Sequence, residues 1–225
     1  AGDRSLTALV AHELAHSWSG NLVTNATWND FWLNEGFTVY FEGRISEALY
    51  GADYAGMLQQ LGRQDLLNTL AQIANGPHPE DSELRLSLNG RDPDEGMTDV
   101  AYEKGAAFLR LLEAQVGRSK FDAFIRDYFE RFAFQSMTTD RFLAHLQTQL
   151  IEPNGLTINT AEWVDGMGLP ANAPTPVSDL FGKVEHEIKR WVAGTPAKDF
   201  ATAKWSTFAW MHFLRHLPDP MSIAQ

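Results

Sequence analysis

Two histidines near the start of the sequence have the spacing of a metal site. His12, Glu13 and His16 form the pattern H-E-x-x-H. On a helix, residues four positions apart lie on the same face about one turn apart, so both imidazoles can reach one metal ion. Zinc accepts nitrogen and oxygen ligands, and a catalytic zinc site leaves one position for water. Glu13 follows His12 and can reach that water without binding the metal. We therefore predict a zinc site with Glu13 as the general base of a peptide hydrolase.

A pattern this short also arises by chance. With seven His in the chain, a random H-E-x-x-H is expected in roughly one chain in a hundred. The pattern here lies within a segment with strong helical periodicity, and this context favours a real site. The apolar faces of that segment come from Leu6, Leu9, Val10 and Leu14.

A third ligand is needed, and Glu35 is the candidate. Eighteen residues separate it from His16, and it lies in Asn34-Glu35-Gly36 at the start of a second predicted helix. A Glu in the first turn of a helix usually complements the helix dipole. Here the intervening loop can fold the two helices antiparallel and bring Glu35 beside the histidines. We predict that His12, His16 and Glu35 hold one Zn²⁺ per chain.

The elements that must position these residues are mostly helical. Residues 76–98 are rich in Pro, Gly and Asp and are predicted to be irregular, with a short strand at 83–88. Prolines mark a linker at 170–177. Helical periodicity and capping residues predict helices at about 5–19, 32–50, 53–74, 102–116, 119–132, 139–150, 178–192 and 206–217.

Composition narrows the classes of partner. The chain has 225 residues, a formal net charge of -11 and no cysteine. The negative charge argues against nucleic acid or an anionic membrane as a partner, and it suits a substrate with a positive charge, such as a peptide amino terminus. Acidity also keeps ordinary proteins soluble. No apolar run approaches the ~20 residues of a membrane helix. The compartment stays open, with the cytoplasm slightly favoured over the periplasm or secretion.

The sequence resembles the alanyl-aminopeptidase family of gluzincins, and within it the leukotriene A-4 hydrolase branch and its bacterial aminopeptidase relatives. The resemblance begins with His-Glu-Leu-Ala-His-Ser-Trp-Ser-Gly-Asn-Leu-Val-Thr at 12–24 and covers nearly the whole chain. The other matching segments are Trp28, Phe31-Trp32-Leu33-Asn34-Glu35-Gly36, Asp92-Pro93-Asp94, Tyr102-Glu103-Lys104-Gly105, Thr138-Thr139-Asp140 and Trp163 through Gly168-Leu169-Pro170.

The resemblance implies further roles and a fold. Tyr102 matches the residue that stabilises the oxyanion, whereas a Tyr at a helix start is otherwise usually a packing residue. Asn34 and Glu42 can orient the ligands, although surface or helix-pairing roles are equally open. The fold implied is mainly α: the helical lobe of a thermolysin-like catalytic domain and the first helices of a C-terminal helical domain. Residues matching the side-chain pocket, or else ordinary core positions, are Trp28, Phe31, Leu86, Leu88, Pro93 and Asp94.

Two departures from the family limit what the resemblance implies. Relatives that open a lipid epoxide carry a second Tyr where this chain has Met97, although their acidic residue has a counterpart in Asp94. We therefore disfavour epoxide hydrolysis. The family's amine-binding G-x-M-E-N segment has no counterpart in this chain. We expect a fragment of a longer protein, without N-terminal and C-terminal parts of its parent.

The expected division of the chain follows from this reading. We predict a zinc-binding part of the catalytic domain at 1–169, a linker at 170–177, and the start of a truncated helical domain at 178–225. The first hypothesis for function is a zinc aminopeptidase that acts on peptides with a free N-terminus. Alternatives are a zinc-binding fragment with weak or no activity, a catalytically silent binding module, and an endopeptidase of the thermolysin type.

Overall fold

The fold is mainly helical, as predicted. The computed structural model describes residues 5–218 and 221, so the expectations about the first four residues and the last residues lie outside it. The α-helices are α1 (Ser5–Ala15), α2 (Trp32–Tyr50), α3 (Ala52–Ala74), α4 (Gly105–Val116), α5 (Arg118–Arg131), α6 (Thr139–Leu146), α7 (Thr160–Val164), α8 (Gly182–Val192) and α9 (Thr207–Arg215). Short 3-10 turns are η1 (Trp28–Asp30), η2 (Pro79–Ser82), η3 (Pro93–Gly96), η6 (Glu152–Asn154) and η7 (Ala197–Asp199), and π-helical turns are η4 (Val100–Lys104) and η5 (Gln147–Ile151).

Helix α2 runs through the middle of the main core. Its residues from Trp32 to Tyr40 are buried, except for the partly buried Asn34, so this half of the helix is covered on nearly every side. Trp32 and Phe37 of α2 each make an edge-to-face contact with Phe142 of α6, with ring centroids 5.4 and 5.6 Å apart. Phe37 also stacks on Tyr128 of α5 at 5.3 Å. These aromatic contacts fix α2, and therefore every side chain it carries, against the rest of the molecule.

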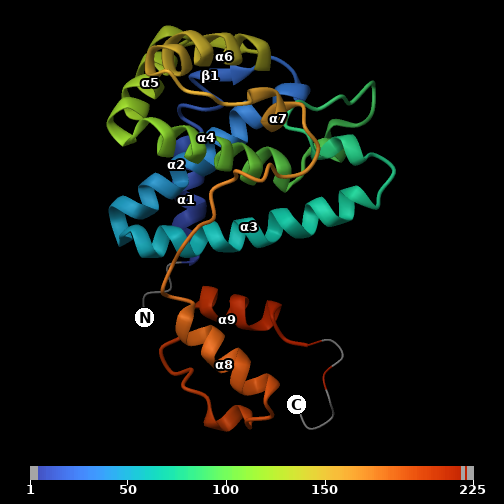
Figure 1. Cartoon of the computed structure of the whole chain (residues 1–225), viewed down its shortest axis with the longest axis vertical. Helices are drawn as coiled ribbons and strands as arrows, with labels where there is room; N and C mark the ends of the chain where they lie inside the picture. Colours follow the sequence, from blue (N-terminus) through green and yellow to red (C-terminus); the bar gives the residue numbers. More distant parts are fainter. Residues whose placement is uncertain (1–4, 219–220, 222–225) are drawn as a thin grey trace.

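Helices α1 and α2 pack in an antiparallel pair (Figure 1). Three contacts along the pair establish the direction. His16 meets Asn34, His12 meets Glu42, and Thr7 meets the hydroxyl of Tyr50. Positions therefore decrease along α1 as they increase along α2. The sequence predicted this antiparallel arrangement of the H-E-x-x-H helix and the helix that begins near Glu35. The apolar side chains on the outer face of α1 are exposed, namely Leu6, Leu9, Val10 and Leu14.

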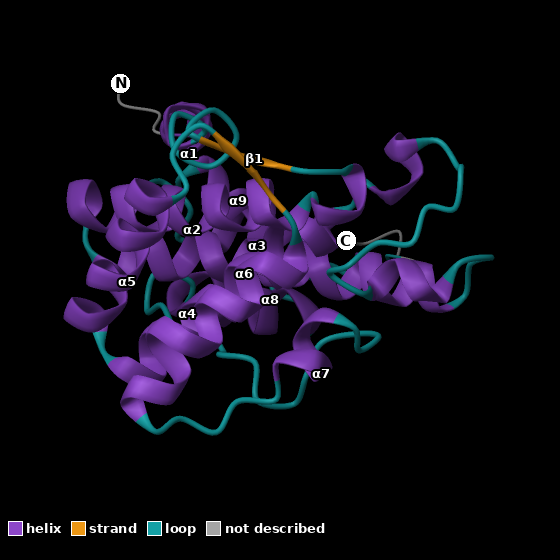
Figure 2. Ribbon diagram, turned by 90° about the horizontal axis from the view of Figure 1, so that it is seen from above, coloured by secondary structure: helices purple, strands orange, loops and turns teal. Residues whose placement is uncertain are grey.

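The only sheet among the described residues is a two-stranded parallel pair, β1 (Val23–Asn25) and β2 (Gln135–Met137). Thr24 pairs with Ser136 at its centre. Figure 2 shows this pair beside α1 at one edge of the molecule. It ties the loop after the H-E-x-x-H helix to the segment before α6.

Helices α8 and α9 lie on the opposite side of α3 from the main core (Figure 1). A second apolar cluster joins them to Met57 and Leu61 of α3 and contains Phe181, Trp191 and Phe213. The division into parts at 1–169, 170–177 and 178–225 stays a prediction. Within the described residues, no helix combines the length and apolarity that crossing a membrane requires.

The predicted strand at 83–88 is wrong. Leu84, Leu86 and Leu88 are buried in alternation, as in a strand. Their backbone hydrogen bonds, however, go to isolated acceptors: Leu84 donates to Val164, and Leu86 donates to Asn29. The alternation therefore reflects burial of one face of an extended segment and not pairing in a sheet.

Several predicted helices are shorter than expected. The first ends at Ala15 because Ser17 and Trp18 donate to carbonyls three residues back, which tightens the last turn. The helix expected at 178–192 begins only at Gly182, because Ser178 instead bonds to Asp53 at the start of α3. The helices expected at 102–116 and 139–150 each include a π-helical turn.

Candidate metal centre

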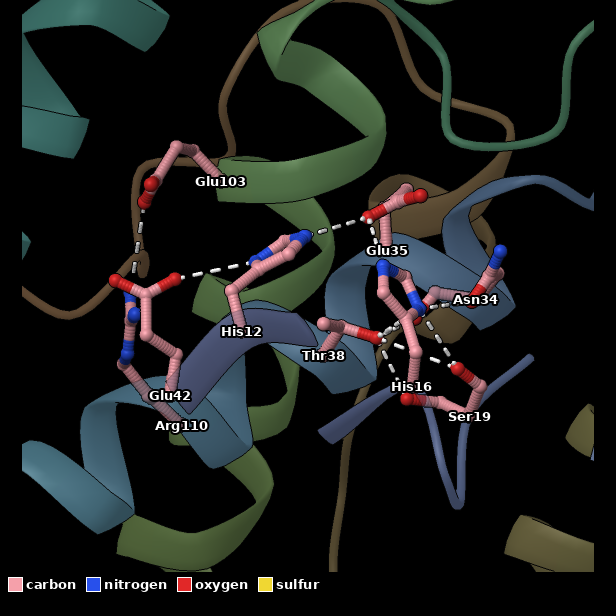
Figure 3. A network of polar contacts seen from close by, with 9 residues as sticks. All are labelled: His12, His16, Ser19, Asn34, Glu35, Thr38, Glu42, Glu103 and Arg110. Carbon is pink, nitrogen blue, oxygen red and sulfur yellow. Dashed lines mark hydrogen bonds and ion pairs between the residues drawn. The ribbon is translucent and has the colours of Figure 1, made fainter. Parts of the chain in front are cut away.

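His12, His16 and Glu35 converge, with one ligand atom of each within 4.8 Å of the others. Glu35 Oε2 lies 3.3 Å from His12 Nε2 and 3.8 Å from His16 Nε2. Figure 3 shows the imidazoles of His12 in α1 and of His16 just after it, both directed at the Glu35 carboxylate of α2. The histidines are partly buried, and Glu35 is only 6% exposed. The structure thus brings the three predicted residues together, and their role as metal ligands stays a prediction.

The far side of each imidazole is held by an acceptor. His12 Nδ1 lies 3.2 Å from a carboxylate oxygen of Glu42. His16 Nδ1 lies 3.0 Å from the carbonyl oxygen of Ser19 and 3.1 Å from Asn34 Oδ1. A carbonyl and a carboxylate can only accept, so in both rings Nδ1 carries the hydrogen and donates it. The Nε2 atoms are therefore the ones free to bind a metal.

The cluster fits a zinc ion on the chemistry of its donors. Glu35 Oε2 is buried and accepts no hydrogen bond of normal geometry from any described residue. Burial by itself lowers the pKa of His12, but the contacts with Glu35 and Glu42 outweigh it and raise the pKa to about 9. Electron-rich atoms thus meet where only a proton or a metal cation can bridge them. Two imidazoles and one carboxylate are a common ligand set for a catalytic zinc ion.

Tyr102 lies beside this cluster. Its ring stacks on His12 with centroids 6.2 Å apart and meets Phe31 edge-on at 5.8 Å. Burial raises the pKa of the Tyr102 phenol to about 12, and the charges of Glu35, Asp99 and Glu13 raise it in the same direction. The hydroxyl therefore keeps its proton at neutral pH and can donate a hydrogen bond. Glu13 is exposed on α1, where its carboxylate can meet a solvent molecule.

The predicted pocket residues differ in how far they are exposed. Trp28 is 50% exposed and contacts Phe31, which is buried against Tyr102. Leu86 and Leu88 are buried around Gly96. Their segment is held next to Asn29, so it runs beside the Trp28 turn.

The remaining predicted residues lie in or next to η3. Pro93 opens this 3-10 turn, and Asp94 is exposed within it. Met97 follows the turn, and its partly buried side chain packs against the main core. Pro93, Asp94 and Met97 make no hydrogen bond, ion pair or ring contact with His12 or His16.

Two of the family-like motifs serve the core. Thr139 accepts a hydrogen bond from Trp32 Nε1 at 3.1 Å, and its backbone donates to buried Asp30 at 2.7 Å. Trp163 is fully buried and stacks on Phe108 with centroids 5.3 Å apart. These side chains hold α2, α4, α6 and α7 together.

Sequence reasoning missed two residues that orient His16. Thr38 Oγ1 lies 3.2 Å from His16 Nδ1 and 2.7 Å from Ser19 Oγ. The periodicity of α2 could have identified Thr38, because it lies four positions after Asn34 and four before Glu42, on the same helix face. Ser19 acts through its carbonyl group, for which the sequence carries no signal.

The model of the peptidase family M1 domain matches residues 1–163 of this chain. Among similar curated proteins, leucine aminopeptidase 2 of Yarrowia lipolytica is 36% identical over 92% of this chain and 33% of its own length. Aminopeptidase B of Rattus norvegicus is 35% identical over 95% of this chain and 35% of its own length. The expected placement among bacterial relatives is not confirmed by these fungal and mammalian proteins.

Two solved structures similar to this chain are an LTA4 hydrolase and an M1 zinc metallopeptidase. Yeast LTA4 hydrolase in complex with bestatin has a TM-score of 0.86 and 35% identity, covering 96% of this chain and 36% of that one. A variant M1 zinc metallopeptidase from Deinococcus radiodurans, bound to a Tyr-Ser-Ala substrate, has a TM-score of 0.55 and 27% identity, covering 76% of this chain and 34% of that one. The chain thus spans about a third of the length of the relatives it matches.

Proposed function

This chain belongs to peptidase family M1, and we propose that it carries the zinc centre of an aminopeptidase. His12, His16 and Glu35 would hold the ion, with one Zn²⁺ per chain. The observation that carries the proposal is the buried Glu35 oxygen that faces both Nε2 atoms and accepts no hydrogen bond from a described residue. When bound, zinc supplies a Lewis acid that polarises the scissile carbonyl and acidifies water.

The residues of the chain would then handle the protons. The Glu13 carboxylate takes a proton from the attacking water and passes it to the nitrogen of the leaving amine. The Tyr102 hydroxyl donates a hydrogen bond to the oxygen on which negative charge develops. Support for this second role comes from its stacking on His12 and from burial and nearby carboxylates, which keep the phenol protonated. Glu42 and Asn34 hold the imidazoles in the tautomer that leaves Nε2 free.

The amino-terminal specificity is proposed from two observations. Similar proteins are named leucine aminopeptidase 2 and aminopeptidase B. The net charge of -11 favours a substrate with a positive amino terminus. Since the relatives are about three times as long, the activity is proposed for the protein as a whole. The alternative is that this chain alone holds zinc with weak or no turnover.

Two other activities have less support. An endopeptidase of the thermolysin type would share the metal ligands, but the chain resembles proteins named aminopeptidases. Epoxide hydrolysis is disfavoured, because the Met97 side chain cannot donate a hydrogen bond.

The test is hydrolysis of aminoacyl anilides, compared with the same compounds acetylated on nitrogen. We expect zinc-dependent release of the arylamine only from substrates with a free amine. Glu13→Gln should lower this activity about 100-fold to 10,000-fold while the bound zinc stays unchanged. Equal cleavage of the acetylated compounds would favour an endopeptidase. Unchanged activity of Glu13→Gln would rule out the assigned general base.

A further inference from the structure

The ammonium group of Lys104 lies inside the protein. Its side chain is 0% exposed. Nζ donates to the carbonyl oxygen of Ser82 at 2.9 Å and to that of Gly166 at 2.7 Å. A buried ammonium without such partners would be strongly destabilising. Lys104 therefore connects three segments that are far apart in the sequence.

The acceptors of Lys104 are themselves fixed. The hydroxyl of Ser82 donates to the carbonyl of Pro79 and accepts a hydrogen bond from the backbone of Gly168 at 3.1 Å. The Ser82 turn is thereby bonded directly to the segment after α7, close to Gly166. The two carbonyls form a rigid base, and the ammonium attaches η4 to it.

Lys104 is the last residue of the π-helical turn η4, which also carries Tyr102. The amide of Gly105 points to the carbonyls of both Tyr102 and Val100. A π turn is a rare conformation that α-helical hydrogen bonding would otherwise replace, and it recurs at functional sites. Residues two positions apart on a helical turn point to different sides. Tyr102 accordingly faces His12, while Lys104 reaches into the interior.

We infer that Lys104 is a positioning residue for Tyr102. Its ammonium binds the Ser82 and Gly166 carbonyls and so holds the π-helical turn in place. This fixes the Tyr102 phenol beside the three predicted metal ligands. This role rests on the proposed function of Tyr102. The hydrogen bonds of its ammonium go to Ser82 and Gly166 and not to the predicted ligands, so it acts through the backbone of η4.

The experiment follows Tyr102 by fluorine NMR. The chain is labelled with meta-fluorotyrosine, and the Tyr102 signal is assigned as the one missing from Tyr102→Phe. In the unaltered protein we expect zinc to shift this signal, because the ring stacks on His12. In Lys104→Met the two carbonyls lose their donor, and we expect the zinc-dependent shift to be lost although zinc still binds. Amide hydrogen exchange in η4 should become about tenfold to 100-fold faster.

A chemical rescue separates positioning from general loss of stability. The chain has no cysteine, so Lys104→Cys introduces a single thiol. Alkylation of the unfolded variant with bromoethylamine forms a carbon–sulfur bond, releases bromide, and restores an ammonium at the length of the Lys side chain. After refolding, the zinc-dependent shift of Tyr102 should return. Arg44→Met, which removes a half-buried cation bonded to Asp122 away from η4, is the control and should leave that shift unchanged.

The outcomes distinguish the two levels of the proposal. If the fluorine chemical shift of Tyr102 does not change when the unaltered protein binds zinc, the proposed role of Tyr102 is contradicted, and this inference with it. A normal shift in both the unaltered protein and Lys104→Met would overturn the inference alone. If Lys104→Met does not fold, Lys104→Gln keeps N–H donors on a side chain one atom shorter, and an intermediate shift is expected; a full shift would again overturn the inference.

Discussion

Gly36 and Gly105 lie in contact where α2 meets the start of α4. A Cβ atom added to Gly36 would lie 2.9 Å from the Cα of Gly105, and one added to Gly105 would lie 2.9 Å from the Cα of Gly36. Gly36 follows Glu35, and Gly105 follows Lys104. The segment with the carboxylate ligand and the segment with Tyr102 therefore meet at their glycines, because only residues without side chains permit this approach.

Gly36→Ala is expected to separate the two segments. The added methyl group would press on the Gly105 backbone, and overpacking of this kind costs about 1–3 kcal/mol of folding free energy. Because the displacement falls between Glu35 and Tyr102, zinc affinity should fall as well. Urea unfolding and a zinc titration measure the two effects. Gly43→Ala, on the same helix with ordinary contact distances, is the control; equal results for both variants would show that the close approach is unimportant.

Zinc should bind to the chain itself. We expect about one zinc ion per purified chain. The variant His16→Ala should lose that zinc, because only one carboxylate and one imidazole remain, whereas a catalytic site needs three protein ligands. Zinc present at 1,000 times its dissociation constant would stabilise the fold by about 4 kcal/mol. Metal analysis and thermal unfolding with and without a chelator measure this. A metal-free unaltered chain that zinc does not stabilise would refute the metal assignment.

Tyr102→Phe should lower kcat with little change in KM. The hydroxyl would act on charge that develops only during the reaction, and loss of one such donor typically costs about 100-fold to 1,000-fold. Zinc content should remain unchanged, since Tyr102 is not a ligand. Steady-state hydrolysis of an aminoacyl anilide by the active protein decides the point. A rise in KM at constant kcat would instead assign Tyr102 to substrate binding.

Glu103→Gln should change the pH dependence of stability. Burial raises the pKa of Glu103 to about 7, although Arg110, 4.0 Å away, opposes the shift. Between the unfolded value of 4.5 and about 7, the folded protein therefore binds more protons than the unfolded chain. The free energy of unfolding consequently falls as pH rises through this window.

Gln cannot ionise, so the variant lacks this pH-dependent loss. Relative to the unaltered protein, its free energy of unfolding should rise on the order of 2 kcal/mol between about pH 5 and pH 8. Urea unfolding at the two pH values gives the difference. The exposed residue Glu95, changed to Gln, is the control. A difference independent of pH would mean that Glu103 titrates normally in the folded protein.

Local periodicity limits how well the sequence predicts tertiary contacts. The alternation at 83–88 predicts a strand, and its leucines are buried on one face, yet the strand does not form because the available acceptors belong to Val164 and Asn29. The burial of Lys104 is likewise invisible in the sequence, since a Lys in a polar motif normally lies at the surface. Its two carbonyl partners come from segments 22 and 62 residues away.

The sequence by itself determined the part of the site that lies on one helix. The four-residue spacing places His16 one turn after His12 on the same face and leaves Glu13 beside them, because helix geometry alone fixes these relations. Only the tertiary structure decided how Glu35, Thr38 and Tyr102 meet that face. Their places depend on the antiparallel packing of α1 on α2, on the contact between Gly36 and Gly105, and on the buried ammonium of Lys104, all of which join residues that no local periodicity relates.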